Sequence, residues 1–341
     1  MDTKEILKKI CAAPGVSGAE HATAAVIKEI VSEYTDDITA DALGNLKATV
    51  NPQSKNGVIL FAHMDKIGLV ITGIDKETGF LRIYPAGGVD ARTAPAQRVK
   101  VYGKKTLDGV IISTPPHLAR PGSEKKAVPA DELAVDCGLP YEEISQLVKE
   151  GDRAEIRNGF FELKNNVCCS EFIDDSAGCT VIIKTLEYLK GKAPDARIEC
   201  VFSTREEVGK GGALTAAFQS DAADALVFDV SFASAHGVPA EKSAPLGSGA
   251  MIGCSPILQK DAFDLCVDTA KAENIPFTVE VSGRSTGTDA DVAVTAGAGK
   301  RTALISVPLK NMHPPVETAD INDIEACARL AAAYIERRTA G

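Results

Sequence analysis

The chain has 341 residues, of which 45% are hydrophobic and 25% charged, and its formal net charge is −10 at pH 7. This composition indicates a globular protein with one large domain or two ordinary ones, and the acidic balance argues against nucleic acid or an anionic membrane as a partner. A membrane span needs about 18 consecutive apolar residues, and no run approaches this length, so we expect no membrane span. The first residues do not show a basic segment followed by an apolar one, so we expect no signal peptide.

Two helices are predicted at the start of the chain, followed by a buried strand. Asp2 and Glu5 are spaced as an N-cap and N3 pair ahead of an apolar segment. Ser17 and Glu20 repeat this capping pattern ahead of a second segment with helical periodicity. Residues 57–62 then form a short continuous apolar run, as expected for a strand that is buried on both faces.

The next part of the chain is rich in short strand-like runs that are separated by glycine, proline and charged turns. These runs lie at residues 69–72, 80–83, 98–101 and 109–112. One helix is predicted near residues 142–148. Short strands at this spacing favour a small barrel or sandwich, so we expect a β-rich domain over residues 67–165, inserted into a domain formed by residues 1–66 and 166–341.

Helices and strands alternate in the remainder. Helices are predicted at residues 177–189, 212–218, 261–272 and 321–337. Strands are predicted at residues 198–202, 225–228, 277–281 and 302–307. This alternation predicts an α/β fold, with a mixed sheet covered by helices on both faces.

The cysteines indicate a reducing compartment. There are nine of them, an odd number, and Cys179, Cys200 and Cys266 lie within apolar or helical runs, where they act as small buried hydrophobic residues. No cysteine lies in a recognisable nucleophile motif. We therefore expect a reduced, cytoplasmic protein.

Apolar runs across the chain end in a histidine or a carboxylate. His63 and Asp65 follow the run 57–62, at a place where a neutral imidazole can ligate a transition metal. Asp65 could accept the other ring N–H of His63 and fix its tautomer, or it could tune a metal site without touching His63. Taken alone, the pair is equally explained by a strand-end histidine that caps a turn.

Two pairs of adjacent carboxylates follow further runs. Capping explains Asp175, which stands where a helix begins, whereas Asp174 comes one residue early and is free to bridge two cations about 3.5–4 Å apart. Glu206 and Glu207 follow the run 200–204. Neighbours in an extended chain point opposite ways, so one could face a metal and the other the attacking water. A solvated pair of glutamates in a loop is the alternative.

Asp229 and His313 complete the set. Asp229 ends the apolar run 225–228, where an unpaired carboxylate is costly, and His313 comes just past the run 303–307. The other histidines are interpreted as structural or surface residues: His21, His117 and His236. Each candidate is ambiguous alone, but the joint set predicts a metal-dependent hydrolase with its site at the strand ends of an α/β sheet.

These residues belong to short motifs that match a known family in order along nearly the whole chain. The motifs lie at residues 14–18, 62–65, 87–90, 97–99, 115–118, 174–178, 206–209, 287–290 and 312–317. Together they resemble those of the M42 metallo-aminopeptidases, the group of the glutamyl and tetrahedral aminopeptidases. The resemblance implies hydrolysis of the N-terminal peptide bond of peptides by a homo-oligomer, from dimer up to dodecamer, with the insertion as dimerisation domain.

The resemblance also implies two divalent metal ions per subunit, zinc before cobalt or manganese. One ion would be held by His63 and Asp229, the other by Glu207 and His313, and Asp174 would bridge them.

For the catalytic residues, the resemblance implies that Glu206 is the general base and acid and that Asp65 is a carboxylate behind the ligands. The Asp174–Asp175 peptide bond is expected to be cis. We expect loops near residues 247–249 and 283–290 to shape the substrate pocket.

Three positions depart from the pattern expected of relatives: Lys66, Ser176 and residues 310–311. None of them is a ligand. A Lys66 ammonium turned toward the cluster would weaken metal binding, and we expect it to point away.

Other functions stay open at this point. A related dimetal amidase or deacylase acting on small acylated amino acids would be favoured by a ferredoxin-like insertion. A non-catalytic assembly protein predicts the loss of a ligand or of Glu206, and none is lost. Glycoside hydrolysis by Glu206 and Asp229 would leave His63 and His313 unexplained.

Overall fold

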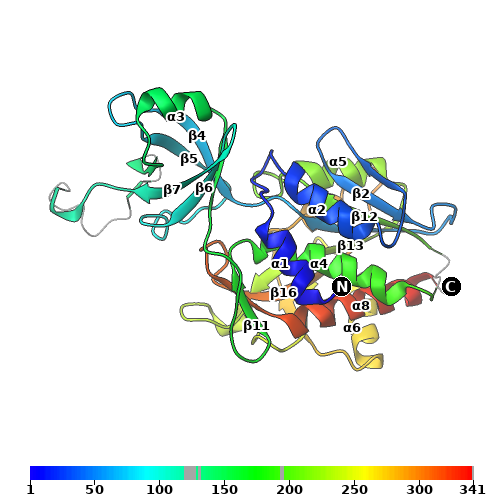
Figure 1. The fold of residues 1–341 in the computed structure, drawn as a ribbon. Coiled ribbons are helices and arrows are strands. Elements are labelled where there is room, and N and C mark those ends of the chain that lie inside the picture. Colours follow the sequence, from blue (N-terminus) through cyan, green and yellow to red (C-terminus); the bar gives the residue numbers. More distant parts are fainter. Residues whose placement is uncertain (119–127, 130–131, 193–195, 340–341) are drawn as a thin grey trace.

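The computed structural model describes residues 1–118, 128–129, 132–192 and 196–339. Figure 1 shows a small β-rich part standing beside a large α/β part. The helices are α1 (Thr3–Ala12), α2 (His21–Val31), α3 (Tyr141–Leu147), α4 (Ile173–Leu189), α5 (Gly211–Gln219), α6 (Lys260–Ala272), α7 (Ala290–Ala293) and α8 (Ile321–Thr339), with short 3₁₀ helices η1 (Pro116–Leu118) and η3 (Ala240–Lys242). No helix in these ranges is long and apolar enough to cross a membrane.

The large part is built on one 11-stranded mixed sheet. Its strands are β1 (Ile38–Ala40), β2 (Leu46–Val50), β3 (Gly57–His63), β10 (Phe161–Glu162), β11 (Val167–Ser170), β12 (Arg197–Ser203), β13 (Asp224–Phe232), β14 (Ala250–Cys254), β15 (Phe277–Val281), β16 (Arg301–Lys310) and β17 (Glu317–Asp320). The main order is β1-β2-β12-β3-β13-β16-β17-β11-β10, and β14 joins β15 to β16. The central strands β12, β3, β13 and β16 run parallel. Their carboxyl ends therefore meet at one edge, where α/β sheets bind ligands.

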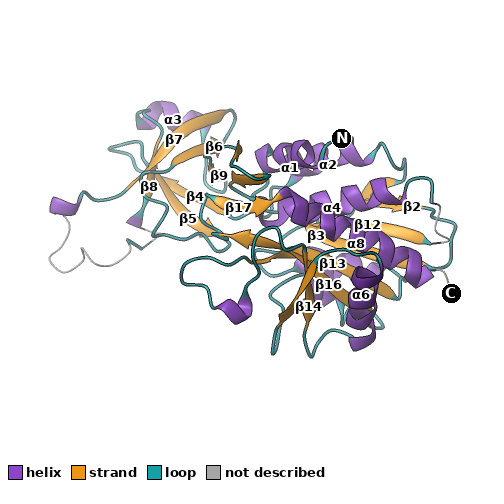
Figure 2. Cartoon of the chain, turned by 90° about the horizontal axis from the view of Figure 1, so that it is seen from below, coloured by secondary structure: helices purple, strands orange, loops and turns teal. Residues whose placement is uncertain are grey.

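Alternate residues of the central strands pack on opposite faces of this sheet. Leu60 of β3 joins the core that α1, α2, α4, α6 and α8 form with the sheet, the face turned toward the viewer in Figure 2. Its neighbour Phe61 packs instead on small residues of α5 and α7, such as Ala213 and Ala293. The apolar runs are continuous because helices cover both faces of the sheet, as predicted.

The insertion is a closed six-stranded barrel, ordered β4-β5-β8-β7-β6-β9. Its strands are β4 (Gly68–Ile74), β5 (Leu81–Ala86), β6 (Arg98–Tyr102), β7 (Thr106–Ile112), β8 (Ala134–Asp136) and β9 (Arg153–Ile156). Inward residues alternate along the strands and fill the barrel with a core of its own, including Leu69, Ile71, Val99 and Val101. Closure of the barrel removes the unpaired strand edges.

The predicted elements are present, with small shifts at their ends. The strand predicted at 277–281 is β15, and the helix predicted at 142–148 is α3. Nine short elements were not predicted from the sequence: β1, β2, β8, β9, β10, β11, β14, β17 and α7. All nine of these elements have only two to five residues. Segments such as Glu317–Asp320 contain no apolar alternation from which a strand could be predicted.

A buried lysine connects the end of α1 to the start of the barrel. Lys66 is 1% exposed, and its Nζ donates to the backbone carbonyls of Ile10, Cys11 and Ala13 at 2.7, 3.1 and 2.6 Å. Arg157, just after β9, binds two of the same carbonyls. The carbonyls that a helix leaves unpaired at its C-terminus are thus satisfied from both parts of the molecule. Lys66 faces away from the candidate site, as expected.

The contribution of Lys66 to stability is expected to rise with pH. Burial lowers the pKa of Lys66 from 10.5 to about 8, so between these values the unfolded chain binds a proton that the folded chain has released. The free energy of unfolding therefore increases with pH through this window. Urea unfolding at pH 7.5, 9 and 10.5 should show the difference between wild type and Lys66→Met growing with pH. Lys28 is exposed, so for the control Lys28→Met the difference in unfolding free energy from wild type should not change with pH. A difference between wild type and Lys66→Met that stays constant with pH would contradict the prediction.

Candidate functional site

His63 is the last residue of β3, at the carboxyl edge of the sheet, and only 2% of it is exposed. Its Nδ1 lies 3.0 Å from the backbone carbonyl oxygen of Asp65. A carbonyl can only accept, so Nδ1 carries the hydrogen and Nε2 is left to face the site. The tautomer is fixed as the sequence suggested, but by the backbone of Asp65; its carboxylate lies 3.5 Å from the same nitrogen.

The Asp65 carboxylate organises the loop that carries the two glutamates. It accepts hydrogen bonds from the backbone N–H groups of Glu206 and Glu207, at 2.9 and 3.2 Å. The hydroxyl of Ser17 donates to it at 2.6 Å. The capping role predicted for Ser17 is therefore wrong: α2 begins four residues later, and the hydroxyl supports Asp65 instead.

Glu206 and Glu207 stand in a turn after β12 and both line the same cleft. The expectation that they point opposite ways is wrong, because it assumed an extended chain. Arg205 has a left-handed backbone with φ of 59°, and the N–H groups of Gly209 and Lys210 bond back to the carbonyls of Glu206 and Arg205. This turn brings two carboxylates to one side, and Lys210 Nζ lies 3.3 Å from Glu206 Oε1.

Asp174 lies between the two histidines at the start of α4. Its Oδ1 is 3.1 Å from His63 Nε2, and its Oδ2 is 3.4 Å from His313 Nε2. The peptide bond to Asp175 is cis, as expected from the family resemblance. Asp175 accepts from the backbone N–H of Gly178 at 2.8 Å, which is the predicted capping role. One carboxylate thus faces both imidazoles while its neighbour stabilises the helix.

The five residues predicted as metal ligands come together in two groups that share one member. His63, Asp174 and Asp229 form the first group, and Asp174, Glu207 and His313 form the second. In each group the candidate ligand atoms all lie within 4.8 Å of one another. Parallel β3 and β13 place His63 and Asp229 at the same edge of the sheet. Imidazole nitrogen and carboxylate oxygen are suitable ligands for a divalent transition metal.

The charges of these groups favour bound cations. Burial by itself lowers the pKa of His63, but its contacts with nearby carboxylates hold that pKa well above 6.5. Burial raises the pKa of Asp174, but hydrogen bonds with His313 and His63 outweigh it and lower that pKa. Burial, together with neighbouring carboxylates, raises the pKa of Glu207 to about 8 and that of Asp229 well above 3.8. The site therefore holds more carboxylates than its imidazoles can neutralise, and divalent cations fit this set.

Glu317 and Gly88 position these groups, although neither residue was assigned a role from the sequence. The two oxygens of Glu317 accept the backbone N–H groups of His313 and Asp174, at 2.8 and 3.0 Å. The carbonyl of Gly88, after β5 of the barrel, lies 3.0 Å from His313 Nδ1, which leaves Nε2 facing the site. A Cβ atom at Gly88 would lie 2.4 Å from that nitrogen, so the close approach requires glycine. Both residues fall inside noted motifs, but nothing in their spacing indicates these contacts.

The groups open into a cleft of about 470 Å³. Its lining includes Thr286, Gly287 and Thr288, as expected for the loop near 283–290. The loop near 247–249 is not among the lining residues; its N–H groups at Gly247 and Gly249 instead bond to Asp323 of α8. Beyond the ligand groups, the lining of the cleft comes from β13, β15, β16, the turn after β12 and the loop before α7.

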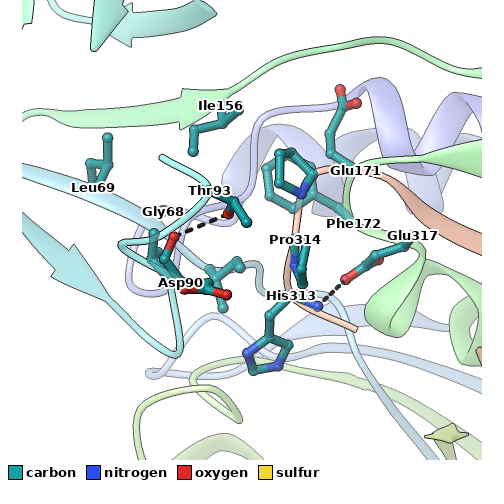
Figure 3. A pocket seen from close by; sticks show the side chains of 13 residues that line it. Gly68, Leu69, Asp90, Thr93, Ile156, Glu171, Phe172, His313, Pro314 and Glu317 are labelled. Atoms are coloured by element: carbon teal, nitrogen blue, oxygen red, sulfur yellow. Dashed lines mark hydrogen bonds between the residues drawn. The ribbon is translucent and has the colours of Figure 1, made fainter. Parts of the chain in front are cut away.

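A second, much smaller pocket lies where the barrel meets the loop that carries His313. Its volume is about 20 Å³, and barrel residues such as Leu69 and Ile156 line it together with Phe172 and Pro314. In Figure 3 the His313 imidazole turns away from Pro314, while its backbone N–H reaches Glu317. Apolar contacts thus hold the loop of His313 against the barrel, while the imidazole of His313 points away from this pocket and toward Asp174.

Comparison with known proteins identifies the class. The family model described as M42 glutamyl aminopeptidase matches residues 44–330. The chain is 33% identical over 337 residues to a lysyl aminopeptidase of Pyrococcus furiosus, covering 97% of this chain and 96% of the relative. An aminopeptidase structure from Desulfurococcus kamchatkensis superposes with a TM-score of 0.92 at 32% identity, covering 99% and 95% of the two chains. The TET1 peptidase of Pyrococcus horikoshii gives a TM-score of 0.86 at 31% identity, covering 97% and 98%.

The fold and the clustered site are therefore those of an α/β peptidase. Within that class, the chain belongs to the M42 family of glutamyl aminopeptidases, which are metal-dependent enzymes. This confirms the resemblance seen in the motifs, and with it the fold class and the peptidase activity.

Proposed function

We propose that the chain is a dimetal aminopeptidase that hydrolyses the first peptide bond of peptides. The single observation that carries the proposal is the sharing of Asp174 by the two ligand groups. His63 and Asp229 would hold one ion, Glu207 and His313 the other, and Asp174 both. We propose zinc as the metal, with cobalt or manganese as alternatives, because imidazole and carboxylate suit all three.

In this proposal the protein residues have separate tasks. The bound ions would polarise the scissile carbonyl and lower the pKa of water. The Glu206 carboxylate, which lines the cleft, takes a proton from the attacking water and returns it to the departing amine. Asp65 keeps Glu206 in place by accepting its backbone N–H, and also that of Glu207. The buried carboxylate of Asp65 thus holds both the proposed base, Glu206, and the proposed ligand, Glu207.

The domain boundaries, assembly and compartment are part of the same proposal. We propose residues 67–165 as a dimerisation domain and residues 1–66 with 166–341 as the catalytic domain of a homo-oligomer. The closed barrel supports this and is not the ferredoxin-like insertion that would favour an amidase. The P. horikoshii relative assembles into a tetrahedron or an octahedral shell, and the P. furiosus relative is named a lysyl aminopeptidase. All nine cysteines are unpaired, which supports a reducing cytoplasm.

Removal of metal is expected to abolish hydrolysis of aminoacyl-p-nitroanilides. The carboxylates and imidazoles alone supply no Lewis acid to polarise the scissile carbonyl. Zinc, cobalt or manganese added back after the chelator is washed out should restore the rate, and elemental analysis should find two ions per subunit. Activity that ignores the chelator, or full activity with one ion per subunit, would reject the dimetal proposal.

A further inference from the structure

One carboxylate in the cleft is neither a proposed metal ligand nor the proposed general base. Glu280 of β15 lines the cleft together with Asp229 and Glu206. Its neighbours Val279 and Val281 are 46% and 69% exposed, on the other side of the strand. Side chains alternate along a strand, so Glu280, between these two valines, points the opposite way, into the cleft that holds the catalytic groups.

The carboxylate of Glu280 has no cationic partner in the part of the chain that the structure describes. It accepts a hydrogen bond from the hydroxyl of Ser231. Lys210, which also lines the cleft, is close to Glu206 instead, with Nζ 3.3 Å from Oε1. Burial raises the pKa of Glu280, because its charge is only partly solvated. A cation from outside the chain would offset that cost.

Glu280 lies where a long side chain of the N-terminal residue of a substrate could reach it from the ligand groups. Ser231 lies two residues after Asp229 on β13, so both side chains point to the same face, about 7 Å apart along the strand. A peptide whose terminal residue lies against the ligand groups can therefore extend its side chain along β13 to Glu280. Phe232 and Met312 add apolar surface to the cleft. Lysine and arginine combine an apolar stem with a charged end, which suits these walls.

We propose that Glu280 makes the cleft selective for peptides whose N-terminal residue has a basic side chain. This inference rests on the proposed aminopeptidase function and names the substrate class of that site. The carboxylate is a specificity determinant, since it contacts the side chain of the substrate and not the bond that is cleaved.

The test compares kcat/KM for the p-nitroanilides of lysine, arginine, leucine and glutamate, using the full chain loaded with metal. Wild type should prefer lysine and arginine over leucine. Glu280→Gln should lower kcat/KM for the two basic substrates by roughly 10- to 100-fold, the loss expected when a charged partner is removed. The leucine substrate should change by no more than about twofold. Glu241→Gln, an exposed residue of η3 outside the cleft, is the control for the charge change.

A charge-reversing variant gives a second, independent measurement. Glu280→Lys should turn the preference toward the glutamate substrate, and thermal unfolding would first show that both variants fold. If both variants hydrolyse the leucine substrate and keep the wild-type ratio of kcat/KM for lysine to that for leucine, the role proposed for Glu280 is wrong. The proposed aminopeptidase function would be unaffected by that result. If the metal-loaded wild type hydrolyses none of the four substrates, the proposed function itself is overturned, and the substrate class with it.

Discussion

Glu206→Gln is expected to lower kcat by about 10²- to 10⁴-fold while leaving the metal content unchanged. Glutamine keeps the size of the side chain but cannot take a proton from water at neutral pH. Glu206 is in neither of the two ligand groups, so the ions should still bind. Its backbone N–H would still donate to Asp65, so the turn should keep its shape. Single-turnover kinetics with elemental analysis of the same sample would measure both quantities.

The matched control for this prediction is Glu142→Gln, an exposed residue of α3 in the barrel with the same change of charge. It should leave kcat within about twofold of wild type. A Glu206→Gln enzyme with nearly full activity would show that another group carries the proton. A variant that loses metal together with activity would instead assign Glu206 to the ligands.

Asp174→Asn is expected to have the second large effect, on metal affinity and activity together. Asparagine offers one carbonyl oxygen without a full charge, so two ions could no longer share the side chain. Even partners behind a ligand cost about 10- to 100-fold in affinity when removed, so loss of a shared ligand should cost at least about 100-fold. Titration of the apo-protein by calorimetry, alongside kcat/KM, measures both effects.

Asp264→Asn on α6 supplies the control, because that carboxylate is solvent-exposed and belongs to neither ligand group. The control should bind two ions as the wild type does. Two-ion binding of wild-type affinity by Asp174→Asn would show that the ions do not share this carboxylate, and the proposed arrangement would be wrong.

The strand-end candidates could be predicted because their strands are long and buried. His63 ends β3, but Asp229 follows the apolar run 225–228 and lies within β13, which continues to Phe232, so the strand end predicted at Asp229 is wrong. Parallel strands still bring these two positions to one edge of the sheet. The distance between the two could not be derived from the runs alone. It follows from β3 and β13 being direct neighbours, and that pairing is decided by long-range packing.

The positioning residues could not be predicted because their partners are distant in sequence. Ser17 has the spacing of a helix cap, yet its hydroxyl donates to Asp65, 48 residues away. Glu317 lies in a four-residue strand without a recognisable pattern, and it bonds to a backbone N–H 143 residues away. Local spacing shows which hydrogen bonds are possible, and the tertiary fold decides which of them form.

The contact between Gly88 and His313 also limits how such an enzyme can be rearranged. The acceptor that orients this imidazole comes from the barrel side, and Arg157 carries a further set of bonds back to α1. A shortened chain without the insertion would lack both anchors, even though its large sheet would be complete. A different barrel grafted onto this chain is therefore expected to disturb the site unless it supplies a glycine carbonyl for His313 and a guanidinium for the end of α1.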